Sequence, residues 1–222
     1  MRLLTYLAIW TLLFSCSSYD PAPKTGKEWI EQSIKYHDPQ GRWANLQAVF
    51  YVEDSLPAGR ESRSYFFTLK NPVSHFSYRF RDLEFEVVGD SVKINIGEVE
   101  NERALRLRNY YSYLWGLPMK LMDPGTLIED SVREETLSGK TYKVVRVPYE
   151  KDIWYFYLNP ENYRMEAYKF YQDEAAGKGE IIYLEGQYDF EGMKIPMNRT
   201  WYRTETPEFL GTDMLKSIQG ID

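Results

Sequence analysis

The sequence predicts a mainly β protein of the α+β type: one strongly curved antiparallel sheet, a half-barrel of about nine or ten strands, with one or two helices on its concave side. From residue 43 onward, apolar and polar residues alternate over short stretches, as they do in half-buried strands. Short turns separate these stretches and bring apolar residues opposite each other. A hydrophobic content of 43% and an aromatic content of 16% indicate a chain that buries a core.

The first residues predict an export signal that ends at the only cysteine. Arg2 precedes an apolar run over residues 3–14, which is shorter than the ~20 residues that a membrane-spanning helix needs. The run ends in Leu13-Phe14-Ser15-Cys16, which resembles the bacterial lipoprotein box. This resemblance implies a signal peptide over residues 1–15, cleavage before Cys16 and a lipid on its sulfur; an ordinary signal or a free cysteine is the alternative. Residues 16–25 are expected to form a polar, proline-bearing tether, and residues 26–222 a single domain.

Two segments carry helical spacing. Thr25 and Glu28 form a possible capping box for a helix whose one face carries Trp29, Ile30, Ser33, Ile34 and His37. A second helix is expected to be capped by Asn101, with Ala104, Leu107, Tyr111 and Leu114 on one face. An apolar connector interrupted by prolines follows over residues 115–124. Such a segment is poorly suited to open solvent, so it is expected to cover an apolar surface.

The predicted strands follow one another as hairpins. They span residues 46–52, 64–69, 76–80, 83–88, 91–96, 132–137 and 141–147, followed by two hairpins that turn near residues 159–162 and 191–192. After Phe80 the apolar phase shifts, which predicts a bulge or a tight turn at Arg81-Asp82.

Three hairpin registers can be tested for self-consistency. A turn at Gly89-Asp90 would pair Val87 with Val92, Phe85 with Ile94 and Leu83 with Ile96. A turn over residues 159–162 would pair Phe156 with Met165 and Trp154 with Ala167. A turn at Glu191-Gly192 would pair Phe190 with Met193, Tyr188 with Ile195 and Ile182 with Trp201, with Asp189 opposite Lys194. Each register places apolar residues opposite each other on one face.

Four stretches resemble uncharacterised outer-membrane lipoproteins of Bacteroidota. They are residues 36–39 with Trp43, residues 110–125, residues 139–145 and residues 188–196. The order of helix and meander also resembles the LolA/LolB-type half-barrels. That resemblance implies an apolar concavity that carries lipoproteins or other acylated cargo, and the predicted anchor is closer to LolB.

Charge and composition exclude several functions. A formal charge of −6 argues against a nucleic-acid partner, which requires a basic surface. One cysteine and two histidines provide no spacing for a metal site, and no glycine-rich phosphate loop or serine nucleophile motif occurs. His37-Asp38 can be read as an acid–base pair or, more simply, as a helix stop. We therefore expect no catalytic residues, no metal, no cofactor and no enzyme activity.

The residues expected to bind a hydrophobic ligand come from the connector and the neighbouring strands. They are Trp115, Leu117, Pro118, Met119, Leu121 and Met122, with Phe85 and Ile94. The alternative for each of them is ordinary core packing.

The functional prediction is an envelope lipoprotein that is anchored to the outer membrane through Cys16, on either face, and binds a lipid or an acylated protein. Two alternatives remain. The 19 tyrosines could form a surface that binds a protein or a glycan. A hydrolase would require a cleft that brings His37 or His75 together with acidic residues. No oligomeric state is predicted.

Overall fold

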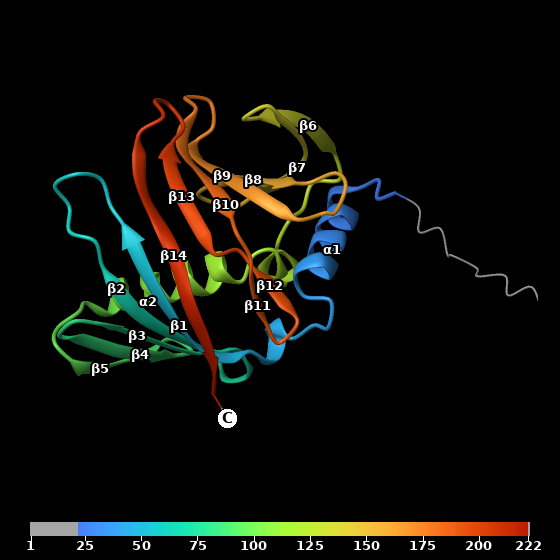
Figure 1. Ribbon diagram of the computed structural model, residues 1–222. Coiled ribbons are helices and arrows are strands. Elements are labelled where there is room, and N and C mark those ends of the chain that lie inside the picture. Colours follow the sequence, from blue (N-terminus) through green and yellow to red (C-terminus); the bar gives the residue numbers. More distant parts are fainter. Residues whose placement is uncertain (1–21, 222) are drawn as a thin grey trace, which may run out of the picture.

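A computed structural model describes residues 22–221, so Cys16, the predicted signal peptide and most of the predicted tether lie outside the described residues. Within this range the protein is mostly antiparallel β, with one large curved sheet of twelve strands that does not close into a barrel (Figure 1). The helices are α1 (Gly26–His37) and α2 (Asn101–Trp115), with short 3-10 helices η1 (Trp43–Asn45), η2 (Asn71–Val73) and η3 (Met119–Met122).

The strands follow the predicted order along the chain. They are β1 (Gln47–Ser55), β2 (Ser64–Lys70), β3 (His75–Phe80), β4 (Leu83–Val88), β5 (Ser91–Ile96), β6 (Val132–Leu137), β7 (Lys140–Pro148), β8 (Ile153–Leu158), β9 (Met165–Asp173), β10 (Lys178–Glu185), β11 (Tyr188–Phe190), β12 (Met193–Ile195), β13 (Asn198–Arg203) and β14 (Phe209–Gly220). Their order in the large sheet is β5-β4-β3-β2-β1-β14-β13-β10-β9-β8-β7-β6, and β11 and β12 form a separate pair.

The last strand, β14, joins two meanders into one sheet. It pairs with β1 on one side and with β13 on the other, so the first and last strands of the sheet region are neighbours. The sequence does not predict β14, because the alternation of apolar and polar residues in it is weak. Gly211 and Asp213 occupy positions on the face that carries Leu215, and an irregularity shifts the register opposite Tyr51 and Val52.

Helix α2 lies between the two arms of the curved sheet. The chain leaves the edge strand β5, passes through α2 and η3, and reaches the other edge strand β6 (Figure 1). Tyr111 and Trp115 pack into a core cluster with β1–β5, whereas Leu114 packs into a second cluster with α1 and β7–β10. The helix thus covers both apolar surfaces, in agreement with the prediction of helices on the concave side.

The first cluster is built from stacked aromatic rings. The rings of Phe50 and Phe67 stack at 4.6 Å, and Phe67 stacks on Tyr111 of α2 at 5.0 Å. Trp115, at the end of α2, packs against both Phe50 and Phe67. Each such buried side chain contributes about 1.5–3 kcal/mol through removal of apolar surface from water, so this cluster fixes α2 on the sheet.

The predicted register of the hairpin at Gly89-Asp90 is confirmed for the residue pairs next to the turn and wrong for the pair at the far end of the strands. Val87 pairs with Val92 and Phe85 with Ile94, around Gly89 at φ 57°. Leu83 was predicted opposite Ile96, but Glu84 takes that place because the register shifts between Glu84 and Phe85. The connection between β3 and β4 at Arg81-Asp82 is a tight turn, which is one of the two alternatives predicted there.

The second predicted hairpin register is wrong. Met165 pairs with Leu158 rather than Phe156, and Trp154 lies opposite Phe170 rather than Ala167. The turn is longer than predicted, because the Asn159 amide donates to the Arg164 carbonyl and Tyr163 adopts φ 64°. A register shift between Tyr157 and Leu158 then moves the pairing by a further residue.

The third predicted register is confirmed in full. Phe190 pairs with Met193, Tyr188 with Ile195 and Asp189 with Lys194. Ile182 pairs with Trp201 in the same register, although the outer part of this long hairpin belongs to the large sheet and the tip forms its own small sheet.

The helix starts differ in their caps. Thr25 and Glu28 form the predicted capping box at α1. At α2 the predicted cap is wrong: Glu100 occupies the N-cap position, its side chain makes no capping bond, and Asn101 is already the first helical residue. The α2 start therefore depends on tertiary packing, beginning with the fully buried Ala104.

Candidate functional site

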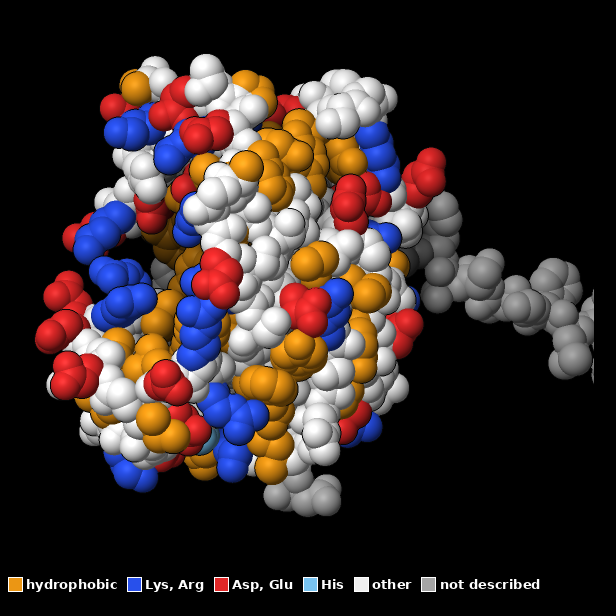
Figure 2. All heavy atoms as spheres, turned by 60° about the vertical axis from the view of Figure 1, so that its left-hand side comes forward, with side chains coloured by type: hydrophobic (Ala, Val, Ile, Leu, Met, Phe, Trp, Pro, Cys, Tyr) orange, Lys and Arg blue, Asp and Glu red, His pale blue; other side chains and the backbone are white. Residues whose placement is uncertain are grey.

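An open groove of about 1000 Å³ lies on the concave side, between α2, the β1–β2 connection and the inner face of β8–β10, β13 and β14. This volume is at the upper end of the ~300–1,000 Å³ that small-molecule sites occupy. Figure 2 shows a hollow on this side of the molecule, with apolar side chains inside it and Lys and Arg side chains beside it. The apolar residues that line the groove are Leu56, Tyr110, Tyr113, Leu114, Tyr149, Trp154, Phe170, Trp201 and Leu210.

Aromatic pairs form the walls. Tyr110 of α2 stacks on Trp201 of β13 at 5.9 Å, and Trp154 of β8 stacks on Phe170 of β9 at 4.7 Å. Tyr113 meets the Trp154 ring edge-on at 5.3 Å. Tyr110 remains 39% exposed although burial raises the pKa of its hydroxyl well above the usual value. Its accessible ring surface therefore belongs to the groove.

A row of charged residues crosses the inner face of the sheet below the groove. Asp54 of β1 is the register partner of Asp213 of β14, which is in turn the partner of Arg199 of β13. Asp213 accepts hydrogen bonds from Trp201 Nε1 at 3.1 Å and from the Tyr65 hydroxyl at 3.4 Å. Burial raises the pKa of the Asp213 carboxyl. Asp213 thereby holds the Trp201 indole in the groove wall.

Arg199 connects the sheet to the end of α2. Its side chain is 1% exposed, and its guanidinium carbon lies 3.5 Å from the centre of the Trp115 ring. Nη1 donates a hydrogen bond to the Pro196 carbonyl at 2.9 Å. A cation over an indole ring in a dry setting is attracted by the ring's negative face. This contact fixes the position of α2, and hence of Tyr110, relative to β13.

The comparisons with known proteins identify the family. A family model described as a family of unknown function (DUF6503) matches residues 3–216. The chain belongs to the DUF6503 family. A search of curated protein sequences found no match for this DUF6503 chain.

Solved structures share the fold of the DUF6503 protein. A LolA superfamily protein from Nitrosomonas europaea is similar with a TM-score of 0.58 at 12% identity, over 89% of this chain and 94% of that chain. A DUF1329 family protein from Desulfovibrio piger gives a TM-score of 0.51 at 8% identity, over 89% and 93%. An outer membrane lipoprotein-sorting protein domain from Vibrio parahaemolyticus gives 0.48 at 9% identity, over 88% and 93%. The first two likenesses show the fold, and the predicted similarity to LolA-type half-barrels is confirmed at that level.

The residues predicted to bind a ligand do not line the groove of the DUF6503 chain. Phe85, Trp115, Leu117 and Leu121 are at most 3% exposed and lie in the two core clusters, and Pro118 is buried as well.

The remaining predicted residues are more accessible. Met119 and Met122 line a second pocket of about 700 Å³ beside α2, and Ile94 is 42% exposed on the edge strand β5. Ligand contact by these three side chains stays a prediction.

Sequence reasoning missed the groove residues for an identifiable reason. Trp154 and Phe170 belong to the hairpin whose register was wrong, and Leu210 belongs to the missed strand β14. Tyr110 lies on α2, but a tyrosine beside Tyr111 carries no pattern that distinguishes a groove from a core position. Inward-facing aromatic residues on neighbouring strands could have indicated the groove only if the pairing of those strands had been predicted correctly.

The two histidines have structural contacts. His37 is 2% exposed; its Nδ1 donates to the Lys194 carbonyl at 2.6 Å and its Nε2 accepts from the Met165 amide at 3.1 Å. Burial is the largest cause that lowers the pKa of His37 to about 4. His75 Nε2 lies 3.1 Å from Glu86 Oε2, and Glu86 also accepts a hydrogen bond from Lys93. In residues 22–221 no serine or threonine hydroxyl is hydrogen-bonded to either histidine.

Clusters of metal-ligating side chains and membrane-spanning helices are both absent from residues 22–221. Between residues 22 and 221, no group of three or more His, Cys, Asp or Glu side chains could hold a metal ion. None of the helices in this part of the chain combines the length and the apolar composition of a membrane span.

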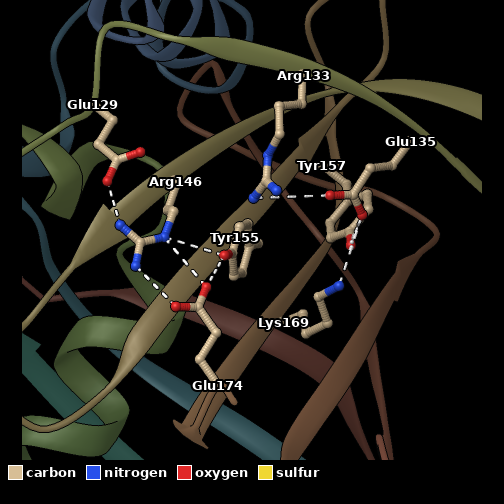
Figure 3. Close-up of polar contacts among 8 residues, drawn as sticks. All are labelled: Glu129, Arg133, Glu135, Arg146, Tyr155, Tyr157, Lys169 and Glu174. Carbon is tan, nitrogen blue, oxygen red and sulfur yellow. Dashed lines mark hydrogen bonds and ion pairs between the residues drawn. The ribbon is translucent and has the colours of Figure 1, made fainter. Parts of the chain in front are cut away.

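Tyrosines on the outer face of β7–β9 form a layer with charged side chains (Figure 3). The Tyr157 hydroxyl donates to Glu135 at 2.7 Å, and the Tyr155 hydroxyl donates to Glu174. Lys169 Nζ lies 5.2 Å from the Tyr155 ring centre and 5.5 Å from the Tyr157 ring centre. The hydroxyls and ring faces of these tyrosines are therefore occupied within the DUF6503 chain, on a sheet face that neither helix covers.

Proposed function

We propose that this DUF6503 protein is a non-enzymatic envelope lipoprotein that binds the acyl chain of a lipid, or of an acylated protein, in the concave groove. The observation that carries the proposal is an open groove of about 1000 Å³ whose apolar lining consists largely of aromatic rings, among them Tyr110, Trp154 and Phe170. Each methylene that leaves water contributes about 0.8 kcal/mol, so ten buried methylenes gain about 8 kcal/mol before the cost of association. An acyl chain is therefore a ligand that can bury many methylenes against these rings.

The predicted anchor gives the groove access to acyl chains. A lipid on Cys16, with further acylation of the new amino terminus, would hold the protein stably at the outer membrane. The ten residues 16–25 would span at most about 36 Å when fully extended, at ~3.6 Å per residue. The domain, which begins with α1 at Gly26, would thus remain near the membrane surface.

Two further observations support a carrier over a surface interaction module. The LolA superfamily protein from Nitrosomonas europaea has a similar fold, although at 12% identity this supports the architecture and not the cargo. Tyr155 and Tyr157 of the outer face are engaged with Glu135, Glu174 and Lys169, whereas Tyr110 presents an accessible ring beside the groove. The concave side thus offers tyrosine ring surface to a ligand.

The test places a charge in the groove. Tyr110→Glu introduces a carboxylate among the groove rings at a 39% exposed position, and Ile96→Glu introduces one at a 52% exposed position on β5, away from the groove. We expect Tyr110→Glu to lose co-purified lipid in native mass spectrometry and to lose binding of a fluorescent acyl probe, with Ile96→Glu unchanged. A wild-type protein that binds no acyl probe, or equal binding by all three proteins, would contradict the proposal.

A further inference from the structure

The charges around the groove identify the kind of lipid that it suits. We infer that the groove binds a single-chain anionic lipid, a long-chain fatty acid, with the carboxylate at Arg60 and Arg106 and the chain along the aromatic wall. This inference rests on the proposed function and names the ligand class for the same site.

Five cationic side chains border the groove, and three of them are already paired. Arg63 lies 2.5 Å from Asp54, Arg203 lies 2.8 Å from Glu208, and Lys120 pairs with Asp123. Arg60 and Arg106 have no ion pair and no side-chain hydrogen bond within residues 22–221. Two guanidinium groups therefore remain for a ligand.

On α2, the charged side chain of Arg106 is followed along the helix by two tyrosines of the groove wall. Arg106, Tyr110 and Tyr113 follow one another at helical spacings of four and three residues, so they share one face of α2. At ~1.5 Å per residue, the seven residues from Arg106 to Tyr113 cover about 10 Å along the groove. A ligand with its charge at Arg106 therefore has aromatic surface ahead of it.

Arg60 comes from a different part of the chain. It belongs to the β1–β2 connection, residues 56–63, which also contributes Leu56 and Arg63 to the border of the groove. Arg60 is exposed, and the connection borders the same groove as the α2 face with Arg106. Two unpaired guanidinium groups that border one groove from separate elements both attract the carboxylate of a ligand in that groove.

Three carboxylates also border the groove, at different places along it. Asp152 lies in the β7–β8 turn beside Tyr149, whose hydroxyl contacts that of Tyr113 at 2.8 Å. Glu180 is the register partner of Arg203, and Asp213 is hydrogen-bonded to Trp201. Burial raises the pKa of all three carboxyls. Asp152 and Glu180 thus accompany the aromatic wall, and Asp213 lies opposite Asp54, which pairs with Arg63. The unpaired arginines lie at the β1–β2 connection and the preceding turn of α2.

The experiment compares a fatty acid with its neutral ester. Binding of cis-parinaric acid and of its methyl ester to the purified protein is measured by energy transfer from tryptophan at pH 7.5. Two partly exposed ion pairs predict about tenfold tighter binding of the acid. The double variant Arg60→Gln/Arg106→Gln should bring the acid to the affinity of the ester and leave the ester affinity within about twofold. Arg103→Gln, an exposed arginine on the same helix that does not border the groove, should behave as wild type.

The outcomes separate this inference from the proposed function. Equal binding of acid and ester by the wild type, or a preference that survives in the double variant, would overturn the inference and leave acyl binding intact. Absence of binding by both probes would overturn the proposed function as well. In the supporting case, a rise in salt weakens binding of the acid and not that of the ester, because exposed ion pairs are screened.

Discussion

Acidification tests the contacts of His37 more directly than any core substitution. His37 joins three elements: it belongs to α1, its Nδ1 donates to the Lys194 carbonyl of β12, and its Nε2 accepts from the Met165 amide of β9. Both contacts require the neutral ring with the proton on Nδ1. A second proton on Nε2 would place a donor against the Met165 amide and a charge in a site that is 2% exposed.

The size of the stability loss follows from the pKa of His37 in the unfolded chain and in the folded protein. Burial, together with the positive charges of Arg164, Lys194 and Arg199, lowers the pKa of His37 from 6.5 to about 4 in the folded protein. Between these values the unfolded chain binds a proton that the folded protein does not, so the free energy of unfolding falls as the pH falls. At about 1.36 kcal/mol per pKa unit, this difference removes roughly 3 kcal/mol of stability between pH 6.5 and pH 4. Above pH 6.5 the effect is absent.

Urea unfolding monitored by tryptophan fluorescence at a series of pH values measures this loss. His37→Gln keeps a hydrogen-bond acceptor but does not titrate, so the titration of the carboxylates is common to both proteins. We expect wild-type stability to fall by roughly 3 kcal/mol more than that of the variant over this range. Parallel pH dependences would refute the reasoning. So would an NMR titration that shows a pKa near 6.5 for the His37 ring in the folded protein, a measurement that needs no variant.

Three further substitutions test the fold by urea unfolding. Thr25→Ala removes the side-chain cap of α1 and should cost about 1 kcal/mol; no loss would show that the capping box is not formed. Trp115→Ala removes a 1% exposed ring that faces Arg199 and should cost about 3–5 kcal/mol, and a loss below 1 kcal/mol would contradict its place in the core. Gly179→Ala would place a Cβ 1.9 Å from the Phe170 carbonyl oxygen and should cost about 1–3 kcal/mol, so a neutral result would contradict this close approach.

The sequence predicted best where short-range chemistry decides the structure. Gly192 at φ 83° follows Glu191 in the turn that sets the register of Phe190 with Met193, and one register placed every apolar pair on the same face. The hairpin around residues 159–162 failed because its turn is closed by Tyr163 at φ 64° and followed by a register shift. Neither feature has a local signature, since a tyrosine rarely adopts positive φ.

The groove could not be predicted from residue type. The apolar connector, residues 115–124, indicated a ligand site, but the structure buries Trp115, Leu117 and Leu121 because they fill the space between the two arms of the sheet. The accessible apolar surface instead comes from Tyr110, Trp154 and their neighbours, which face each other across elements far apart in the chain. Only the strand order, with β14 between β1 and β13, brings them together.

Two pairs of tyrosines, one on the outer face and one on the concave face, differ in their surroundings. On the outer face, Tyr155 and Tyr157 present rings to Lys169 and hydroxyls to glutamates, so amphipathic side chains seal a sheet face that has no helix over it. On the concave face, Tyr110 and Tyr113 occupy one side of α2 and leave ring surface open to the groove. The first group needs no ligand, because its polar and apolar parts are both satisfied within the chain. The second group has accessible apolar surface beside unpaired arginines, and that combination is satisfied by a ligand that is apolar along its length and anionic at its end.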